Sequence, residues 1–192
     1  KNLLRALQVY QVQGGVDQII GFFRQALNQN SFGNTEIREQ IGNVARGIPG
    51  SERFKPEDKQ RFIKFAVEEL QKETARPSKD VKHLLFLGGI LNQSLNLDPS
   101  YPELARRTLE EAHRLSPTKQ MIGFELAQHY VLTGNGEGAA NVLYRVWKGD
   151  TSHLEAGVNL WIIAIITKKS DIISEVAAKL DIKKLGEPEL FR

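Results

Sequence analysis

The sequence predicts an all-α chain built from antiparallel helix hairpins. Apolar residues recur at steps of three and four, glycines and prolines interrupt this pattern at intervals, and no stretch alternates with the period of two that marks a strand. The length of 192 residues suits one domain or a short helical array. Hydrophobic residues make up 41% and charged residues 26%, which excludes a disordered or collagen-like chain.

Start and stop signals order the helices of the first half. Gly14 and Gly15 separate two apolar stripes, as expected where one helix ends and the chain reverses. A helix is predicted to begin at Pro56, because acidic residues follow it where the helix dipole favours negative charge. Pro77 is predicted to end that helix. The expected helices of this half are about 3–11, 19–27, 34–46, 56–76 and 80–97.

The second half carries the same kind of signals. Ser100 and Ser152 each precede a glutamate by three residues, the spacing of a capping box, and Ser170 reads as a third helix cap. Ser116 followed by Pro117 reads as another helix start. The expected helices are about 101–115, 117–134, 138–147, 152–168 and 170–180, which makes ten in all.

The hairpins repeat one pattern around their turns. The matched positions are Tyr10, Gly14, Ile19, Phe23 and Ala26 in the first hairpin and Tyr130, Gly134, Ala139, Leu143 and Val146 in a later one. This pattern resembles the tetratricopeptide repeat, well over 2–31 and 117–150, partly over 83–117 and 151–180, and weakly over 34–76. The resemblance implies a right-handed α-solenoid of about five hairpins, forming a single helical-repeat domain over residues 1–192.

Three strings carry a more specific resemblance. They are KNLLRAL at the start, SFGNTEIREQI from Ser31 to Ile41, and RLSPTKQ from Arg114 to Gln120. Together they resemble the soluble helical-repeat tail of bacterial O-antigen ligase or polymerase-family membrane proteins. The resemblance implies a role beside surface-glycan assembly, but the motif residues of that family lie in its membrane core, so it assigns no catalytic residue here. Because the chain begins at Lys1, we expect a piece or a processed product of a longer protein.

Signatures of enzyme chemistry do not emerge, so we expect no catalytic, cofactor-binding or metal-binding residue and no cofactor. The sequence has no cysteine and no Gly-x-Ser-x-Gly motif. The glycine-rich stretch 134–138 follows no predicted strand and reads as a hairpin turn with left-handed backbone positions rather than a phosphate loop. Glu110 and His113 have the spacing of two metal ligands, but a solvated ion pair is the favoured interpretation.

Charge and hydropathy limit the classes of partner. The net charge of +3 divides as +4 over residues 1–96 (14 basic, 10 acidic) and −1 over 97–192 (12 basic, 13 acidic), which argues against nucleic-acid binding. The apolar stretches 83–91 and 158–166 are too short to cross a bilayer, which takes roughly 20 residues. We therefore expect membrane association only through an upstream segment, with the side of the membrane undetermined. Two interpretations remain for the doublets Lys168–Lys169 and Lys183–Lys184. They contact anionic lipid or glycan phosphate, or they only complement the helix dipole at helix C-termini.

The remaining hypothesis is a non-catalytic scaffold that binds a protein or peptide. By the repeat registration, a concave groove is expected to present Gln8, Gln11, Gln128, Val131, Asn135 and Asn159. This lining is rich in amides rather than basic, which argues against capture of an acidic C-terminal peptide. The apolar stretch 160–166 is expected to be buried between hairpins, with an exposed partner-binding patch as the alternative. The scaffold is either the tail of an O-antigen ligase-like membrane protein or a free-standing adaptor.

Overall fold

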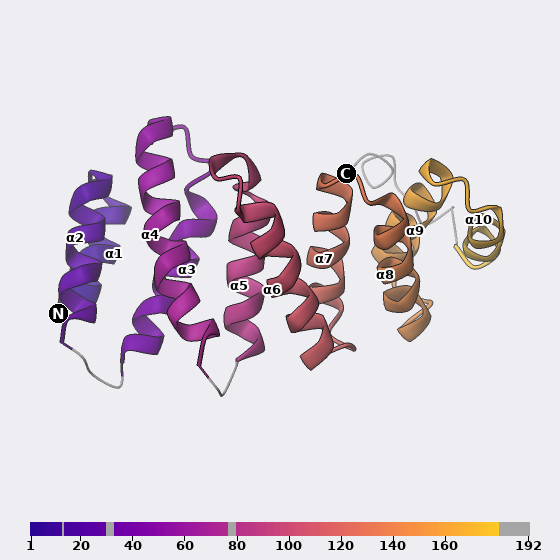
Figure 1. Cartoon of the computed structure of the whole chain (residues 1–192), viewed down its shortest axis with the longest axis horizontal. Coiled ribbons are helices and arrows are strands. Elements are labelled where there is room, and N and C mark those ends of the chain that lie inside the picture. The colour runs from indigo at the N-terminus through magenta and orange to yellow at the C-terminus, as the bar shows by residue number, and fades with distance from the viewer. Residues whose placement is uncertain (13, 30–32, 77–79, 181–192) are drawn as a thin grey trace. The chain divides into compact units, whose positions relative to one another are not determined.

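A computed structural model describes residues 1–12, 14–29, 33–76 and 80–180. All regular structure in these residues is helical, and the ten α-helices confirm the predicted number (Figure 1). The helices fall into two compact units, 1–112 and 113–192, whose boundary lies within α6. Whether the chain behaves as one domain stays a prediction.

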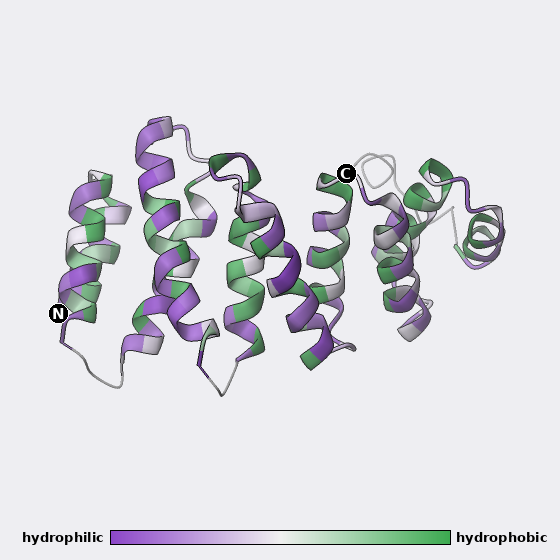
Figure 2. Ribbon diagram, viewed as in Figure 1, coloured by the Kyte–Doolittle hydropathy of each residue, from purple (hydrophilic) through white to green (hydrophobic). Residues whose placement is uncertain are grey.

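The N-terminal unit contains three successive helix pairs. Their bounds are α1 Asn2–Gln11, α2 Val16–Leu27, α3 Asn34–Gly47, α4 Pro56–Thr74, α5 Val81–Asn92 and α6 Tyr101–Leu115, with a short 3-10 turn at Leu95–Leu97. The single helix predicted over 80–97 is therefore wrong at its end, because α5 stops at Asn92 and a separate turn follows. α1 packs on α2 and α3 on α4, while α5 contacts both α3 and α4. Figure 2 shows the consequence for α5, which is hydrophobic along most of its length, whereas α4 is striped.

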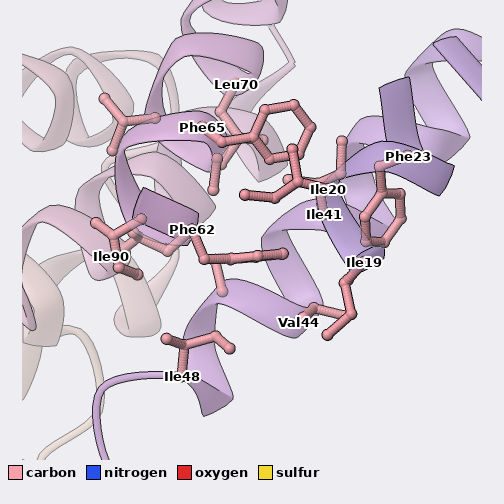
Figure 3. Close-up of a cluster of buried hydrophobic side chains, with 14 of the residues drawn as sticks. Ile19, Ile20, Phe23, Ile41, Val44, Ile48, Phe62, Phe65, Leu70 and Ile90 are labelled. Atoms are coloured by element: carbon pink, nitrogen blue, oxygen red, sulfur yellow. The ribbon is translucent and has the colours of Figure 1, made fainter. Parts of the chain in front are cut away.

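Aromatic and branched side chains from α2, α3, α4 and α5 form the core of this unit (Figure 3). Phe62 of α4 is fully buried, and its ring makes edge-on contacts with Phe23 at 6.4 Å and Phe65 at 6.0 Å between centroids. Ile41 and Ile90 close the same cluster from α3 and α5. Burial of one side chain of this size contributes about 1.5–3 kcal/mol, so the cluster is a main source of stability for the unit.

The long connection between α3 and α4 is packed against the first hairpin. Ile48 and Phe54 are buried, and the Arg53 guanidinium lies over the Phe54 ring at 4.2 Å and the Tyr10 ring at 5.0 Å. Arg53 also donates a hydrogen bond to the Tyr10 carbonyl oxygen at 2.6 Å. The weak repeat match in this region thus reflects a connection with its own packing.

A buried ionic cluster joins α3 to α4. Arg38 donates to Glu69 Oε2 at 3.1 Å and to Glu73 Oε1 at 2.6 Å, and the three side chains are about nine-tenths buried or more. Lys72 and Arg76 bind the outer oxygens of the two glutamates. The sequence analysis did not anticipate this cluster, because charged residues at helical spacing ordinarily face water.

The C-terminal unit consists of tightly connected helices. Their bounds are α7 Gln120–Leu132, α8 Gly136–Gly149, α9 Leu154–Ile166 and α10 Ser170–Ala177. α7 packs on α8, α8 on α9, and α9 on α10. Gly134, in the turn between α7 and α8, has φ +78°, which confirms the predicted left-handed position. At the far end, Tyr144 and Lys148 of α8 both donate to the Glu175 carboxylate of α10.

The predicted caps at Ser152 and Ser170 are wrong, whereas Ser100 directly precedes α6, at the position that the prediction requires. Ser100 and Ser152 donate their hydroxyls to Asp98 and Asp150, each at 2.6 Å, two residues earlier in the chain. These bonds hold the pKa of both aspartates below the usual range, because they stabilise the ionised carboxylate.

Other residues therefore stand at the starts of the last helices. His153 caps α9, since its Nδ1 accepts a hydrogen bond from the Ala156 amide at 3.2 Å. Lys169 precedes α10, whose first residue is Ser170, and Lys119 precedes α7, which begins after Ser116 and Pro117 rather than at them.

Some predictions fall outside the described residues. They concern Ser31, Pro77 and the doublet Lys183–Lys184. Of the described helices, none is both long and apolar enough to span a bilayer.

Candidate functional site

A groove of about 480 Å³ lies between α7 and α9, with α8 behind it. Its lining residues are Met121, Phe124, Glu125, Ala127, Gln128 and Val131 of α7, Leu143 of α8, and Glu155, Asn159, Ile162 and Ile163 of α9. All belong to the C-terminal unit.

The sequence explains why one face of α7 is available to this groove. Met121, Phe124, Gln128 and Val131 follow one another at steps of three, four and three, so they share one stripe of the helix. The opposite stripe, which includes Ile122 and Leu126, is buried. α7 thus contributes one face to the core and leaves the other to the groove.

α9 is fixed beside α7 at its first turn. His153, the residue that caps α9, lies against Phe124 of α7, with the ring centroids 5.7 Å apart and the ring planes inclined by 51°. Leu143 of α8 is 4% exposed and supports the groove from behind. Cap, ring contact and buried leucine together hold the two walls of the groove.

Exposed apolar side chains distinguish the groove from ordinary surface. Met121 is 58% exposed, Val131 47% and Ile162 39%. Apolar residues grouped in a hollow are a mark of binding surfaces, whereas single exposed ones are common on any protein.

The predicted burial of the 160–166 stretch is correct only on one side of α9. Leu160 and Ala164 are fully buried, but Ile162, Ile165 and Ile166 are 39%, 48% and 68% exposed. α8 and α10 cover part of α9 and leave the rest uncovered by described residues. The alternative interpretation, an exposed apolar patch, describes this part of the helix.

Three of the six predicted groove residues come together. Gln128, Val131 and Asn159 line the groove. Asn135 instead caps α8, because its side-chain oxygen accepts a hydrogen bond from the Gly138 amide at 2.9 Å. Gln8 and Gln11 are exposed on α1, in the other unit.

Sequence reasoning missed the aromatic and acidic members of the groove. Phe124 and Met121 were detectable, since they lie one and two turns before Gln128 on the same stripe. Glu155 has capping-box spacing from Ser152, and this spacing gives no sign that its side chain lines the groove.

A second hollow of about 460 Å³ lies between α8 and the start of α10. It is polar, and its charged lining residues are Arg145, Lys169 and Asp171. Lys169 also lies 3.6 Å from Glu137, so carboxylates accompany the basic doublet at 168–169.

The described residues contain no group of three His, Cys, Asp or Glu side chains that could hold a metal ion. His113 is half-buried on α6, and both burial and the nearby positive charge of Arg145 lower its pKa. Glu110, its proposed ion-pair partner, forms a salt bridge with Arg106 at 2.7 Å.

Solved structures resemble this chain along most of its length. The crystal structure of MamA matches with a TM-score of 0.62 at 16% identity, over 85% of each chain. TTC0263, a thermophilic TPR (tetratricopeptide repeat) protein from Thermus thermophilus, matches with a TM-score of 0.56 at 18% identity, over 98% of this chain and 93% of that one. The chain has a tetratricopeptide-like α-solenoid fold. At these identities the similarity establishes the fold alone, and the sequence matches no protein-family model and no curated protein.

Proposed function

We propose that this chain is a non-catalytic protein-interaction scaffold and that the groove between α7 and α9 binds a peptide segment of a partner protein. The supporting observation is the grouping of Met121, Val131 and Ile162, all at least 39% exposed, around one hollow. Covering apolar surface of this kind contributes about 25 cal/mol per Å² removed from water.

The polar residues of the groove suit a peptide backbone. Gln128 and Asn159 face the groove from opposite walls. A side-chain amide both donates and accepts hydrogen bonds, as a peptide group does, so such a pair can satisfy backbone groups of a bound segment. Apolar contacts would supply affinity and the amides would orient the chain.

A matched pair of double variants tests this function. A random twelve-residue peptide library displayed on phage is panned on the full chain, and binding of the selected peptides is measured by fluorescence polarisation. Val131→Gln with Ile162→Gln should weaken binding by about tenfold or more, because two apolar contacts are lost without a change in charge. Peptides that show this loss are called groove-dependent peptides below.

The control is Leu4→Gln with Val12→Gln, two exposed apolar residues of the first hairpin. Binding should be unchanged in this variant, and circular dichroism should show that both double variants are folded. The proposal fails if no selected peptide binds, or if the two double variants weaken binding equally.

Two settings suit such a scaffold. The resemblance of three sequence strings to O-antigen ligase tails favours a membrane protein of surface-glycan assembly, where the basic doublets would contact glycan phosphate. The fold is equally consistent with a free-standing adaptor. Immunoblotting of the native protein after alkaline carbonate extraction separates the two: a large protein retained in the membrane pellet supports the first, and release of a protein of about 21.6 kDa supports the second.

A further inference from the structure

The charges of the groove have one sign. Of its eleven lining residues, two are glutamates, Glu125 and Glu155, and none is lysine or arginine. α7, α8 and α9 follow one another through short connections, so α7 and α9 run in the same direction (Figure 1). Glu155 lies in the first turn of α9 and Glu125 near the middle of α7, so the negative charge extends from one end of the groove to its middle.

Apolar side chains lie at both ends of the groove, and at the end away from Glu155 no charged lining residue accompanies them. Val131 and Ile162 lie in the C-terminal halves of α7 and α9. The groove thus passes from an end that is both apolar and acidic, where Met121 and Glu155 lie, through the amides of Gln128 and Asn159, to an end that is apolar alone. A ligand that complements it must change character along its length in the same way.

Glu155 is the more available of the two carboxylates. It is exposed and forms no ion pair with any other described residue, whereas Glu125 is half-buried and has a partner within the chain. α9 contains no lysine or arginine, and the first cation after it, Lys168, is thirteen residues from Glu155 in the chain and beyond the helix end. No described cation on this helix therefore neutralises the acidic end.

We propose that the groove selects peptide segments in which a lysine or arginine accompanies a large apolar residue. The cation faces Glu155 and the apolar side chain contacts Ile162. Seven helical residues separate these two positions, or about 10.5 Å, and an extended peptide covers that distance in about three residues. This inference rests on the proposed peptide-binding function and adds the charge and spacing of the ligand.

Glu155→Gln tests the charge without changing the shape of the groove. Glu155 also lies in the first turn of α9, where it stabilises the helix dipole. Glu137→Gln is the matched control, because Glu137 occupies the first turn of α8, is exposed, and does not line the groove. Helix stabilisation is lost in both variants, and the groove charge only in the first.

The groove-dependent peptides supply the measurement. We expect Lys and Arg to be enriched about threefold over the unpanned library, near three residues from a large apolar residue. Glu155→Gln should weaken these peptides by about three- to tenfold at low salt and reduce the effect of 0.5 M NaCl, while Glu137→Gln should leave both unchanged. Panning on Glu155→Lys should select acidic residues instead.

Each alternative outcome has a distinct meaning. Groove-dependent peptides without basic enrichment, or an equal effect of the two Glu→Gln variants, overturn the charge proposal and leave peptide binding in place. A library that yields no groove-dependent peptide overturns the proposed function itself, and the charge proposal with it.

Discussion

Replacement of Gly123 by alanine tests the packing between α7 and α8. Gly123 is buried, and a Cβ atom added there would lie 2.3 Å from Val146 Cγ2 of α8. Non-bonded carbon atoms pack at about 3.5–4.0 Å, so the new methyl group would be at least about 1.2 Å too close. Val146 cannot easily rotate away, because a valine in a helix strongly prefers one χ1 rotamer.

Two opposing contributions set the size of the effect. Alanine is favoured over glycine in a helix interior by about 0.8–1.0 kcal/mol. Overpacking of a filled core typically destabilises by about 1–3 kcal/mol, and the stiff neighbour places this site in the upper part of that range. We therefore expect Gly123→Ala to lower the free energy of unfolding by about 1–2 kcal/mol, measured by urea denaturation followed by circular dichroism.

Gly21→Ala in α2 is the control, because no heavy atom lies within 4 Å of a Cβ added there. This variant should be more stable than the parent by about 0.5–1 kcal/mol, since only the helix preference acts.

A double-mutant cycle identifies the clash as the cause. Val146→Ala alone removes two methyl groups, at about 0.8 kcal/mol each plus a cavity term. In the double variant the methyl group introduced by Gly123→Ala would occupy the space left by Cγ2, so the double variant should be at least as stable as Val146→Ala. Effects that add within about 0.5 kcal/mol would refute the reasoning, as would a Gly123→Ala protein more stable than the parent.

Three further predictions concern the core, the groove and the pH dependence. Arg38→Ala should destabilise the chain by about 3–5 kcal/mol in chemical denaturation, because it leaves two buried glutamates without their shared cation. Leu143→Ala should cost about 2–5 kcal/mol through a cavity, whereas the exposed Gln128→Ala should cost under about 0.5, and equal losses would contradict the assigned faces. Burial and Arg145 lower the pKa of His113, so the native state favours the neutral imidazole. The stability that this group contributes is complete above about pH 6.5, and it declines as the pH falls from there toward the lower native pKa. Urea midpoints at pH 7.5 and 5.0 should therefore differ less in His113→Gln than in the parent chain.

Local signals were sufficient for the helix count and the turns. Gly134 adopts the left-handed conformation that a glycine in a tight helix connection predicts, and the apolar stripes of α2 and α4 are buried as their spacing indicates. These features depend on residues a few positions apart, which the sequence displays directly.

Features that depend on competition between neighbours were not predictable in the same way. Ser152 has capping-box spacing, yet its hydroxyl donates to Asp150 and His153 caps α9 instead. Arg38 is buried only because Glu69 and Glu73 meet it from another helix. Such pairings are set by tertiary contact, and periodicity does not encode them.

The candidate groove was predictable in part for a related reason. Gln128, Val131 and Asn159 followed from the register of two hairpins. α9 is apolar nearly all round, so its sequence does not indicate which face is covered. The exposure of Ile162 depends on which side of α9 the helices α8 and α10 contact. Asn135 does not line this groove, and its side chain caps α8.

The Arg38 cluster has a consequence for how α3 and α4 are aligned along their axes. In α7 and α8 a tight turn leaves little freedom for one helix to slide past the other, but eight residues, 48–55, join α3 to α4. A slide of one helical turn, about 5.4 Å, would keep many apolar contacts while separating Arg38 from both carboxylates in a water-poor interior. We infer that the ion pairs select one axial register where the connection does not. Charge at this interface would then discriminate between axial registers of α3 and α4 that have similar apolar contacts. A substitution that preserves side-chain volume but removes the charges would yield a stable hairpin with a less uniquely defined register.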